Sequence, residues 1–82
     1  MDANEVVTRV KEIVTKKLGV DESQVTLEAS FTKDLGADSL DTIELVMEFE
    51  KAFDITIDEA DQAKVQTVGQ VIEYVKNQLN IK

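Results

Sequence analysis

The chain of 82 residues contains no cysteine, no histidine and no proline. Without cysteine it forms neither disulfides nor thiolate metal sites. Without histidine it lacks the commonest general base and the commonest side-chain metal ligand. No apolar run is long enough to span a membrane, and the start of the chain lacks the basic-then-apolar order of a signal peptide. We therefore expect a cytoplasmic protein without membrane insertion; the alternative is the mature form of a protein from an organelle matrix or stroma.

Positive charge is scarce as well, and it is unevenly placed. The chain has 17 acidic and 9 basic residues, which gives a net charge of −8. Residues 34–61 hold ten of the acids and a single base, Lys51, so this segment alone carries −9. Nucleic acid is disfavoured as a partner because its phosphates repel such a chain. The expected partners are proteins or ligands with positive surfaces.

The spacing of apolar residues predicts an all-α fold. Apolar side chains recur every three or four residues in three stretches, and each stretch follows an Asp or Thr suited to cap a helix. A shorter helical turn is expected near residues 59–63, and no stretch alternates long enough to build a sheet. We expect a small four-helix bundle with a short third helix and a long loop between helices one and two. The longer helices are expected at residues 3–17, 39–52 and 68–79.

Apolar positions also predict what is buried. In the second helix we expect one stripe of residues widened by a neighbouring apolar group. The long loop, about residues 20–37, is above the usual length, so we expect it to be either functional or packed by isolated anchors. The expected stripe is Leu40, Ile43, Met47 and Glu50, widened by Val46, Phe49 and Phe53, and the expected anchors are Val20, Val25, Leu27, Phe31 and Leu35.

The candidate site lies where the long loop meets the second helix. Ser39 falls at the first helical position behind Asp38, where free N–H groups and the helix dipole favour an attached anion. The alternative is that this Asp-Ser pair only caps the helix. Catalysis by Ser39 is disfavoured because the Gly-x-Ser-x-Gly pattern and a histidine base are both missing. A calcium loop starting at Asp34 is disfavoured too, since its twelfth position is Leu45.

The second helix carries an acidic face. Asp41, Glu44 and Glu48 are spaced by three and four residues, and each like-charge pair costs about 0.2–0.5 kcal/mol of helix stability. One interpretation is a solvated face that keeps the protein soluble. A docking face for a basic patch better explains why bases are missing here and present elsewhere.

At these residues the chain resembles the acyl carrier proteins of fatty-acid synthesis. The resemblance is carried by LGADSLDTIELVM at residues 35–47 and KVQTV at residues 64–68, and it extends over about residues 3–79. It implies that a separate transferase attaches 4′-phosphopantetheine from coenzyme A to Ser39, and that the thiol of this group carries acyl chains as thioesters. It implies a carrier with no catalytic residue and no metal site.

The resemblance also implies partners. These are the phosphopantetheinyl transferase and the fatty-acid synthase enzymes. Basic patches on these enzymes would dock onto the carrier, a monomeric domain of residues 1–82. Asp58 stands where many family members have proline, so it is expected to cap the short third helix without proline's backbone restraint. Lys51 interrupts the acidity that many members show there. The expected partner-binding residues are Asp38, Leu40, Asp41, Glu44, Met47 and Glu48.

Two other functions remain open at this point. One keeps the mechanism and changes the cargo to polyketide, aminoacyl or other specialised acyl groups. The other is an acidic helical adaptor that binds proteins through the second helix and carries nothing on Ser39.

Overall fold

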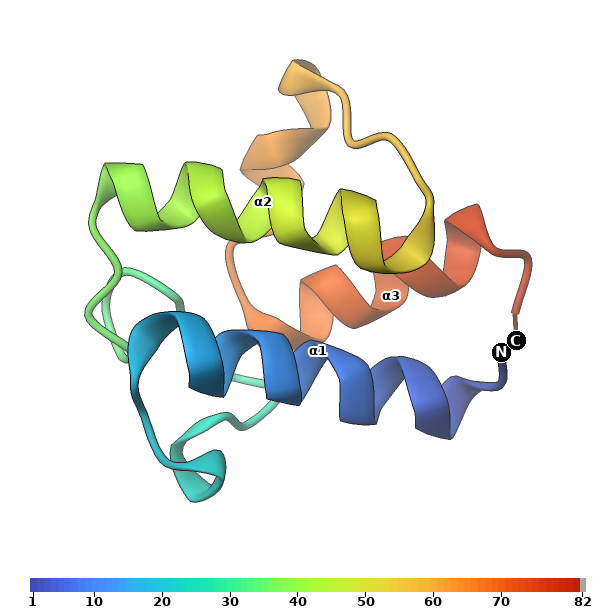
Figure 1. Cartoon of the computed structure of the whole chain (residues 1–82). Coiled ribbons are helices and arrows are strands. Elements are labelled where there is room, and N and C mark those ends of the chain that lie inside the picture. The colour runs from blue at the N-terminus through green and yellow to red at the C-terminus, as the bar shows by residue number, and fades with distance from the viewer. Residues whose placement is uncertain (82) are drawn as a thin grey trace.

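The computed structural model describes residues 1–81, which include all but the last residue of the expected carrier domain. The helix α1 (Ala3–Leu18) contacts both α2 (Ser39–Phe53) and α3 (Val68–Gln78). As Figure 1 shows, α1 and α2 run in opposite directions and α3 lies behind them. Two 3-10 helices, η1 (Glu22–Gln24) and η2 (Glu59–Lys64), complete the fold, and η2 is the expected short third helix. The predicted all-α bundle is confirmed.

The helix starts follow the capping pattern expected from the sequence. In each of the three α-helices the N-cap side chain accepts a hydrogen bond from the third N–H of the helix, which otherwise has no intrahelical partner. Compared with the prediction, α1 and α2 each extend one residue further and α3 ends one residue earlier. The capping bonds run from Glu5 N–H to Asp2 Oδ1 (2.9 Å), from Asp41 N–H to Asp38 Oδ1 (2.8 Å) and from Gln70 N–H to Thr67 Oγ1 (3.2 Å).

The core lies where the three α-helices meet, and it is made mainly of valine. Burial of these aliphatic side chains is the main favourable contribution to folding, at about 25 cal/mol per Å² of apolar area. β-branched residues are mediocre helix formers, so this packing rather than helix propensity holds the helices together. The buried positions are Val6, Val10 and Val14 of α1, Leu45, Val46, Phe49 and Phe53 of α2, and Val68, Val71, Ile72 and Val75 of α3.

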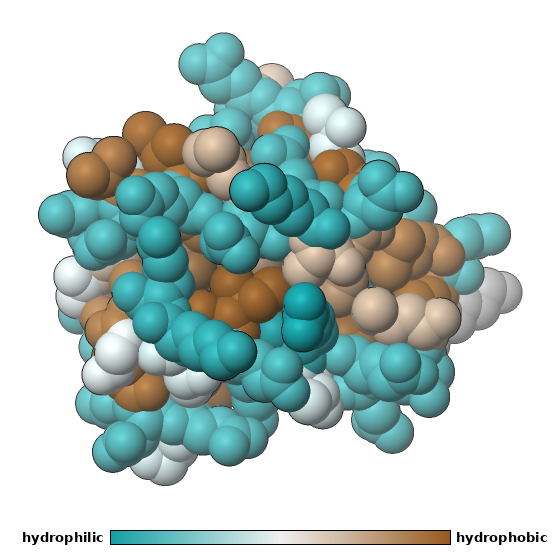
Figure 2. Space-filling view, viewed as in Figure 1, coloured by the Kyte–Doolittle hydropathy of each residue, from teal (hydrophilic) through white to brown (hydrophobic). Residues whose placement is uncertain are grey.

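The expected burial of α2 is partly wrong. Leu40, Ile43 and Met47 are 62%, 54% and 51% exposed, whereas the group expected to widen the apolar face forms the buried side. The reason is that the two sets lie on different sides of the helix, and α2 turns the side with Phe49 toward the core. Figure 2 shows hydrophobic atoms at the surface over the start of α2, at the upper left.

Glu50, expected in that exposed stripe, has a structural role. It is half-buried, and its Oε2 accepts a hydrogen bond from the N–H of Ile57 at 2.9 Å. This bond ties the segment that follows α2 back to the helix. Asp58 next takes the N-cap position of η2, but within residues 1–81 its carboxylate makes no capping bond. The expected N-cap position is therefore confirmed, but the carboxylate does not form the capping bond; the carbonyl of Asp58 instead accepts the N–H of Asp61 at 2.8 Å.

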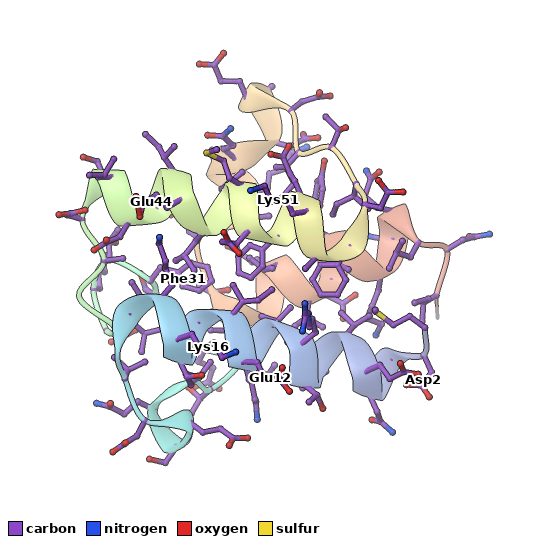
Figure 3. All side chains as sticks on the ribbon, viewed as in Figure 1. Asp2, Glu12, Lys16, Phe31, Glu44 and Lys51 are labelled. Atoms are coloured by element: carbon purple, nitrogen blue, oxygen red, sulfur yellow. The ribbon has the colours of Figure 1, made fainter. Side chains whose placement is uncertain are left out.

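The long loop is anchored to the core by its side chains. Val25, Phe31 and Leu35 are buried as expected, and the ring of Phe31, labelled in Figure 3, lies 6.3 Å from the ring of Phe49 between centroids. Val20 is only half-buried.

Backbone hydrogen bonds also join the long loop to the start of α3. The N–H of Val68 donates to the carbonyl of Ala29 (3.1 Å), and the N–H of Gly69 donates to the carbonyl of Leu27 (2.9 Å). The expected anchoring by Leu27 is wrong, because its backbone rather than its side chain packs against α3 and the side chain is exposed. A Cβ at residue 69 would lie 2.9 Å from that carbonyl oxygen, so glycine is required for this close approach.

Candidate functional site

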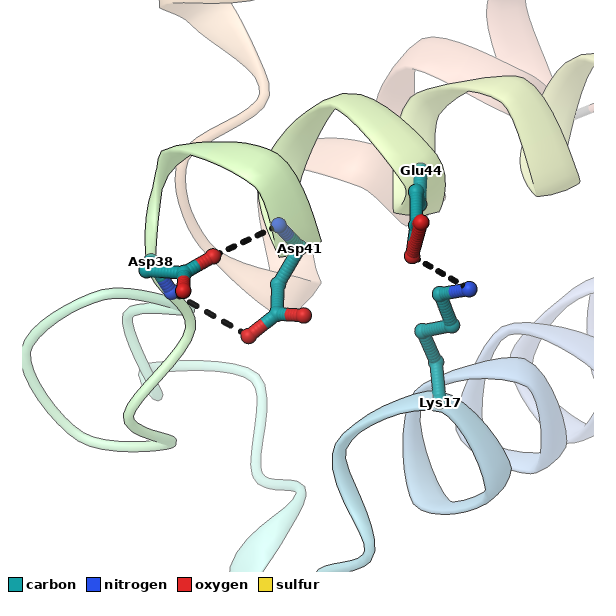
Figure 4. A network of polar contacts seen from close by, with 4 residues as sticks. All are labelled: Lys17, Asp38, Asp41 and Glu44. Atoms are coloured by element: carbon teal, nitrogen blue, oxygen red, sulfur yellow. Dashed lines mark hydrogen bonds and ion pairs between the residues drawn. The ribbon is translucent and has the colours of Figure 1, made fainter.

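Ser39 is presented at the surface as the first residue of α2. Its side chain is exposed, and within residues 1–81 it makes no hydrogen bond. Capping is done by its neighbours instead: Asp38 Oδ1 accepts the N–H of Asp41, and Asp41 Oδ2 accepts the N–H of Asp38 at 3.3 Å. Figure 4 shows this reciprocal pair. The Ser39 hydroxyl is therefore not needed to cap the helix and is accessible to another molecule.

The segment before Ser39 is held in place by buried neighbours. Leu35 and Ala37 are both buried, and the N–H of Ala37 donates to the carbonyl of Phe31 at 2.8 Å. Gly36 between them has a φ of +73°, a conformation that favours glycine. The backbone segment that leads to Ser39 is therefore held in place on both sides of the tight turn at Gly36.

Asp34 serves this turn as well. Its Oδ2 accepts the N–H of Ser30 at 2.7 Å, and its own N–H donates to the carbonyl of Ser30 at 2.9 Å. The carboxylates of Asp34 and Asp38, which begin the calcium-like spacing, are thus both engaged by backbone N–H groups. Within residues 1–81 no three acidic, histidine or cysteine side chains are grouped to hold a metal ion.

Beyond Ser39, the exposed side of α2 combines apolar and acidic side chains. Leu40, Ile43 and Met47 form an apolar stripe along the helix. Asp41 and Glu44 are half-exposed and Glu48 is exposed beside it. The sequence predicted Leu40 and Met47, but not Ile43, as partner-binding residues. The signal was available, because Ile43 lies three residues after Leu40 and four before Met47 and so shares their side of the helix.

One acidic side chain of this surface is paired. Lys17, in the last turn of α1, places its Nζ 2.6 Å from Oε2 of Glu44 (Figure 4). The hydrogen bond to Glu44 is the main cause that raises the pKa of Lys17 above its ordinary value, against a lowering by burial; the charges of Glu44, Glu48 and Asp41 raise it further. Lys17 is therefore a cation at physiological pH. No sequence spacing links α1 to α2, so this pair was not predicted.

A hollow of about 230 Å³ opens beside the first turn of α2, between the long loop and η2. Buried Phe31 and Val65 line it together with Thr42.

The short helix η2 is tied to α3 by a side-chain hydrogen bond, in which the hydroxyl of Tyr74 donates to Oδ2 of Asp61 at 3.0 Å. Burial is the main cause that raises the pKa of Tyr74, and the hydrogen bond to Asp61 raises it further.

The family profile described as the phosphopantetheine attachment site matches residues 8–75, which is most of the chain. An acyl carrier protein of Thermotoga maritima is 52% identical over 75 residues, covering 92% of this chain and 93% of that protein. The chain belongs to the acyl carrier protein family. Acyl carrier proteins are carriers rather than enzymes, and their prosthetic group is 4′-phosphopantetheine.

Membership of the acyl carrier protein family accounts for the general function that the sequence predicted. The chain carries acyl groups and works with enzymes that load and use them. None of the helices formed by residues 1–81 combines the length and apolar character that crossing a membrane requires.

Proposed function

We propose that this carrier holds the growing acyl chain of fatty-acid biosynthesis on a 4′-phosphopantetheine group attached to Ser39. The observation that carries the proposal is the exposed Ser39 hydroxyl at the first position of α2, where Asp38 rather than Ser39 makes the capping hydrogen bond. The sequence of the surrounding residues 35–47 resembles that of fatty-acid carriers more than that of carriers for polyketide or aminoacyl groups. The carrier acts as one monomeric domain in the cytoplasm, or in an organelle matrix or stroma.

The residues around Ser39 suit the prosthetic group. A phosphodiester formed on the Ser39 oxygen would carry a negative charge at the N-terminus of a 15-residue helix. The helix dipole and the unpaired N–H groups of the first turn stabilise an anion there. When attached, the group supplies a flexible arm ending in a thiol, which holds the acyl chain as a thioester. The chain itself has no cysteine, so this thiol would be the carrier's only one.

Delivery to partner enzymes rests on the exposed side of α2, which we call the docking face. Its apolar stripe would be buried against a partner, while its carboxylates attract a basic patch. Attraction of this kind raises the association rate and leaves the contact short-lived, which suits a carrier that serves several enzymes in turn. The docking face consists of Asp38, Leu40, Asp41, Ile43, Glu44, Met47 and Glu48.

Attachment is tested by the intact mass of the purified chain before and after incubation with coenzyme A, magnesium and a phosphopantetheinyl transferase. The chain is expected to gain one phosphopantetheine, Ser39→Ala is expected to gain none, and the control Ser23→Ala, in the exposed helix η1, is expected to behave like the original chain. Circular dichroism should show Ser39→Ala folded, since the side chain makes no contact that the fold needs.

The alternatives separate in the same experiment. An unmodified chain under conditions that modify a control carrier would favour the acidic adaptor that carries nothing on Ser39. A loaded chain that only polyketide or aminoacyl enzymes accept would keep the mechanism and change the cargo.

A further inference from the structure

Among the residues that the structure describes, Lys17 is the one base of α1 that forms an ion pair with an acidic residue of α2. Its side chain is only 32% exposed, and its Nζ lies 2.6 Å from Oε2 of Glu44. The carboxylates of Asp41 and Glu48, on either side of Glu44 along the helix, also act on its pKa. Lys17 thus sits within the field of three of the four acidic residues of the docking face.

Its neighbour Lys16 differs in one respect. Both lysines belong to the last turn of α1, and both line a hollow of about 220 Å³ between α1 and α2 together with Glu48. Lys16, labelled in Figure 3 on α1, is exposed and makes no ion pair within residues 1–81. The two residues therefore contribute the same charge near α2, but in the described part of the chain only Lys17 forms an ion pair with a carboxylate there, that of Glu44.

We propose that Lys17 is a specificity-determining residue of the docking face, because it holds the Glu44 carboxylate and leaves Asp41 and Glu48 to partner cations. This inference rests on the proposed function. A partner whose cations match Asp41 and Glu48 docks without disturbing the pair. A partner that places a cation at Glu44 has to displace Lys17 first and associates more slowly. The phosphopantetheinyl transferase is expected to be such a partner, because it must reach Ser39 and Glu44 lies only five residues further along α2.

The effect is expected to be modest and dependent on salt. Exposed ion pairs are weak, so a partner can displace Lys17, and its removal is expected to speed association about two- to five-fold at low salt. At about 1 M salt the screening length falls to about 3 Å, and the difference should disappear.

The test uses the full chain and the rate at which a phosphopantetheinyl transferase loads it, measured as kcat/KM at low and high salt. Four variants are compared with the original chain: Lys17→Met, the matched control Lys16→Met, Glu44→Gln, and the double variant Lys17→Met/Glu44→Gln. Methionine keeps the length of the aliphatic stem and removes the charge. Lys17→Met should exceed Lys16→Met at low salt by about two- to five-fold, and this excess should vanish when Glu44 is also replaced.

Three outcomes would overturn the proposal. Equal rates for Lys17→Met and Lys16→Met would mean that only overall charge matters. An excess that persists with Glu44→Gln would mean that Lys17 acts independently of that carboxylate. A slower rate for Lys17→Met would mean that Lys17 itself assists docking. Failure of the original chain to load at all would instead refute the attachment to Ser39.

Discussion

Gly69 stands at the closest approach between the long loop and α3, and its replacement by alanine should destabilise the fold. At an ordinary exposed helix position, Gly→Ala stabilises by up to about 1 kcal/mol through helix propensity. Here the new Cβ would lie 2.9 Å from the carbonyl oxygen of Leu27, which also accepts the N–H of Gly69 at 2.9 Å. The obstacle is backbone, so no side chain can rotate away to make room.

The magnitude follows from two costs that this contact imposes together. Moving the loop away loses a hydrogen bond worth about 0.5–1.5 kcal/mol, and the remaining overpacking costs about 1–3 kcal/mol. After the propensity gain of about 1 kcal/mol is subtracted from their sum, Gly69→Ala should lower the free energy of unfolding by about 0.5–3.5 kcal/mol. For a domain of this size each kcal/mol lowers the Tm by about 4–8 °C.

Urea and thermal unfolding followed by circular dichroism measure the change. The matched control is Asn77→Ala, an exposed position of the same helix that should be neutral or slightly stabilising. Amide hydrogen exchange should be faster at Val68, whose N–H bonds the same loop, and at Val10 in the core of α1 it should speed up by no more than the loss of global stability. A Gly69→Ala variant as stable as the original chain, or more stable, would refute the close approach.

Three further predictions concern the segment from Glu50 to Asp61. Glu50→Ala removes the carboxylate that accepts the N–H of Ile57 and should cost about 1.5–3 kcal/mol in urea unfolding, whereas an unchanged midpoint would contradict that role. Asp58→Pro should stabilise by about 0.4–1 kcal/mol, because Asp58 already has the φ of −62° that proline imposes; a loss of stability would count against it. Tyr74→Phe loses the bond to Asp61 and should cost about 0.5–1.5 kcal/mol at neutral pH. Because folding raises the pKa of Tyr74 above its ordinary value of 10.0, that contribution is present below about pH 10 and is lost as pH rises further. The variant should lack this alkaline step, and an identical pH profile for both chains would contradict the assignment.

The helices could be predicted from the sequence because their signals are local. A cap and its N–H partner are three residues apart, as in Asp2 with Glu5 and Thr67 with Gln70, so the sequence contains the whole interaction. The position of Ser39 behind its Asp cap follows from the same kind of signal. These features of the fold and the site are determined within one helical turn.

The orientation of α2 could not be predicted in the same way. Apolar residues cover much of this helix, and periodicity reveals a stripe without revealing which stripe another helix covers. Phe49 is buried because the ring of Phe31 meets it, and Leu40 and Met47 are exposed because no described element packs over them. Such choices depend on neighbours that are distant in the sequence.

The other features that the sequence did not predict are contacts between segments that are distant in the chain. The pairing of Lys17 with Glu44 joins α1 to α2, and the approach of Gly69 to Leu27 joins α3 to the loop. Neither the spacing of charges nor the glycine content of the sequence predicts these two contacts. Each contact forms only when the packing of the helices brings its two partners together. The acidity of α2 was visible in the sequence, whereas the lysine that occupies part of it was not.

The central claim is that Ser39 holds the acyl chain. We would load the carrier with a phosphopantetheinyl transferase, add the enzymes and substrates of a dissociated fatty-acid synthase, and identify by tandem mass spectrometry the peptide that bears the acyl chain. We expect an acyl-phosphopantetheine on Ser39, with the acyl chain released by hydroxylamine as is typical of a thioester. An acyl chain on another residue, or a loaded carrier that the synthase never acylates, would contradict the central claim.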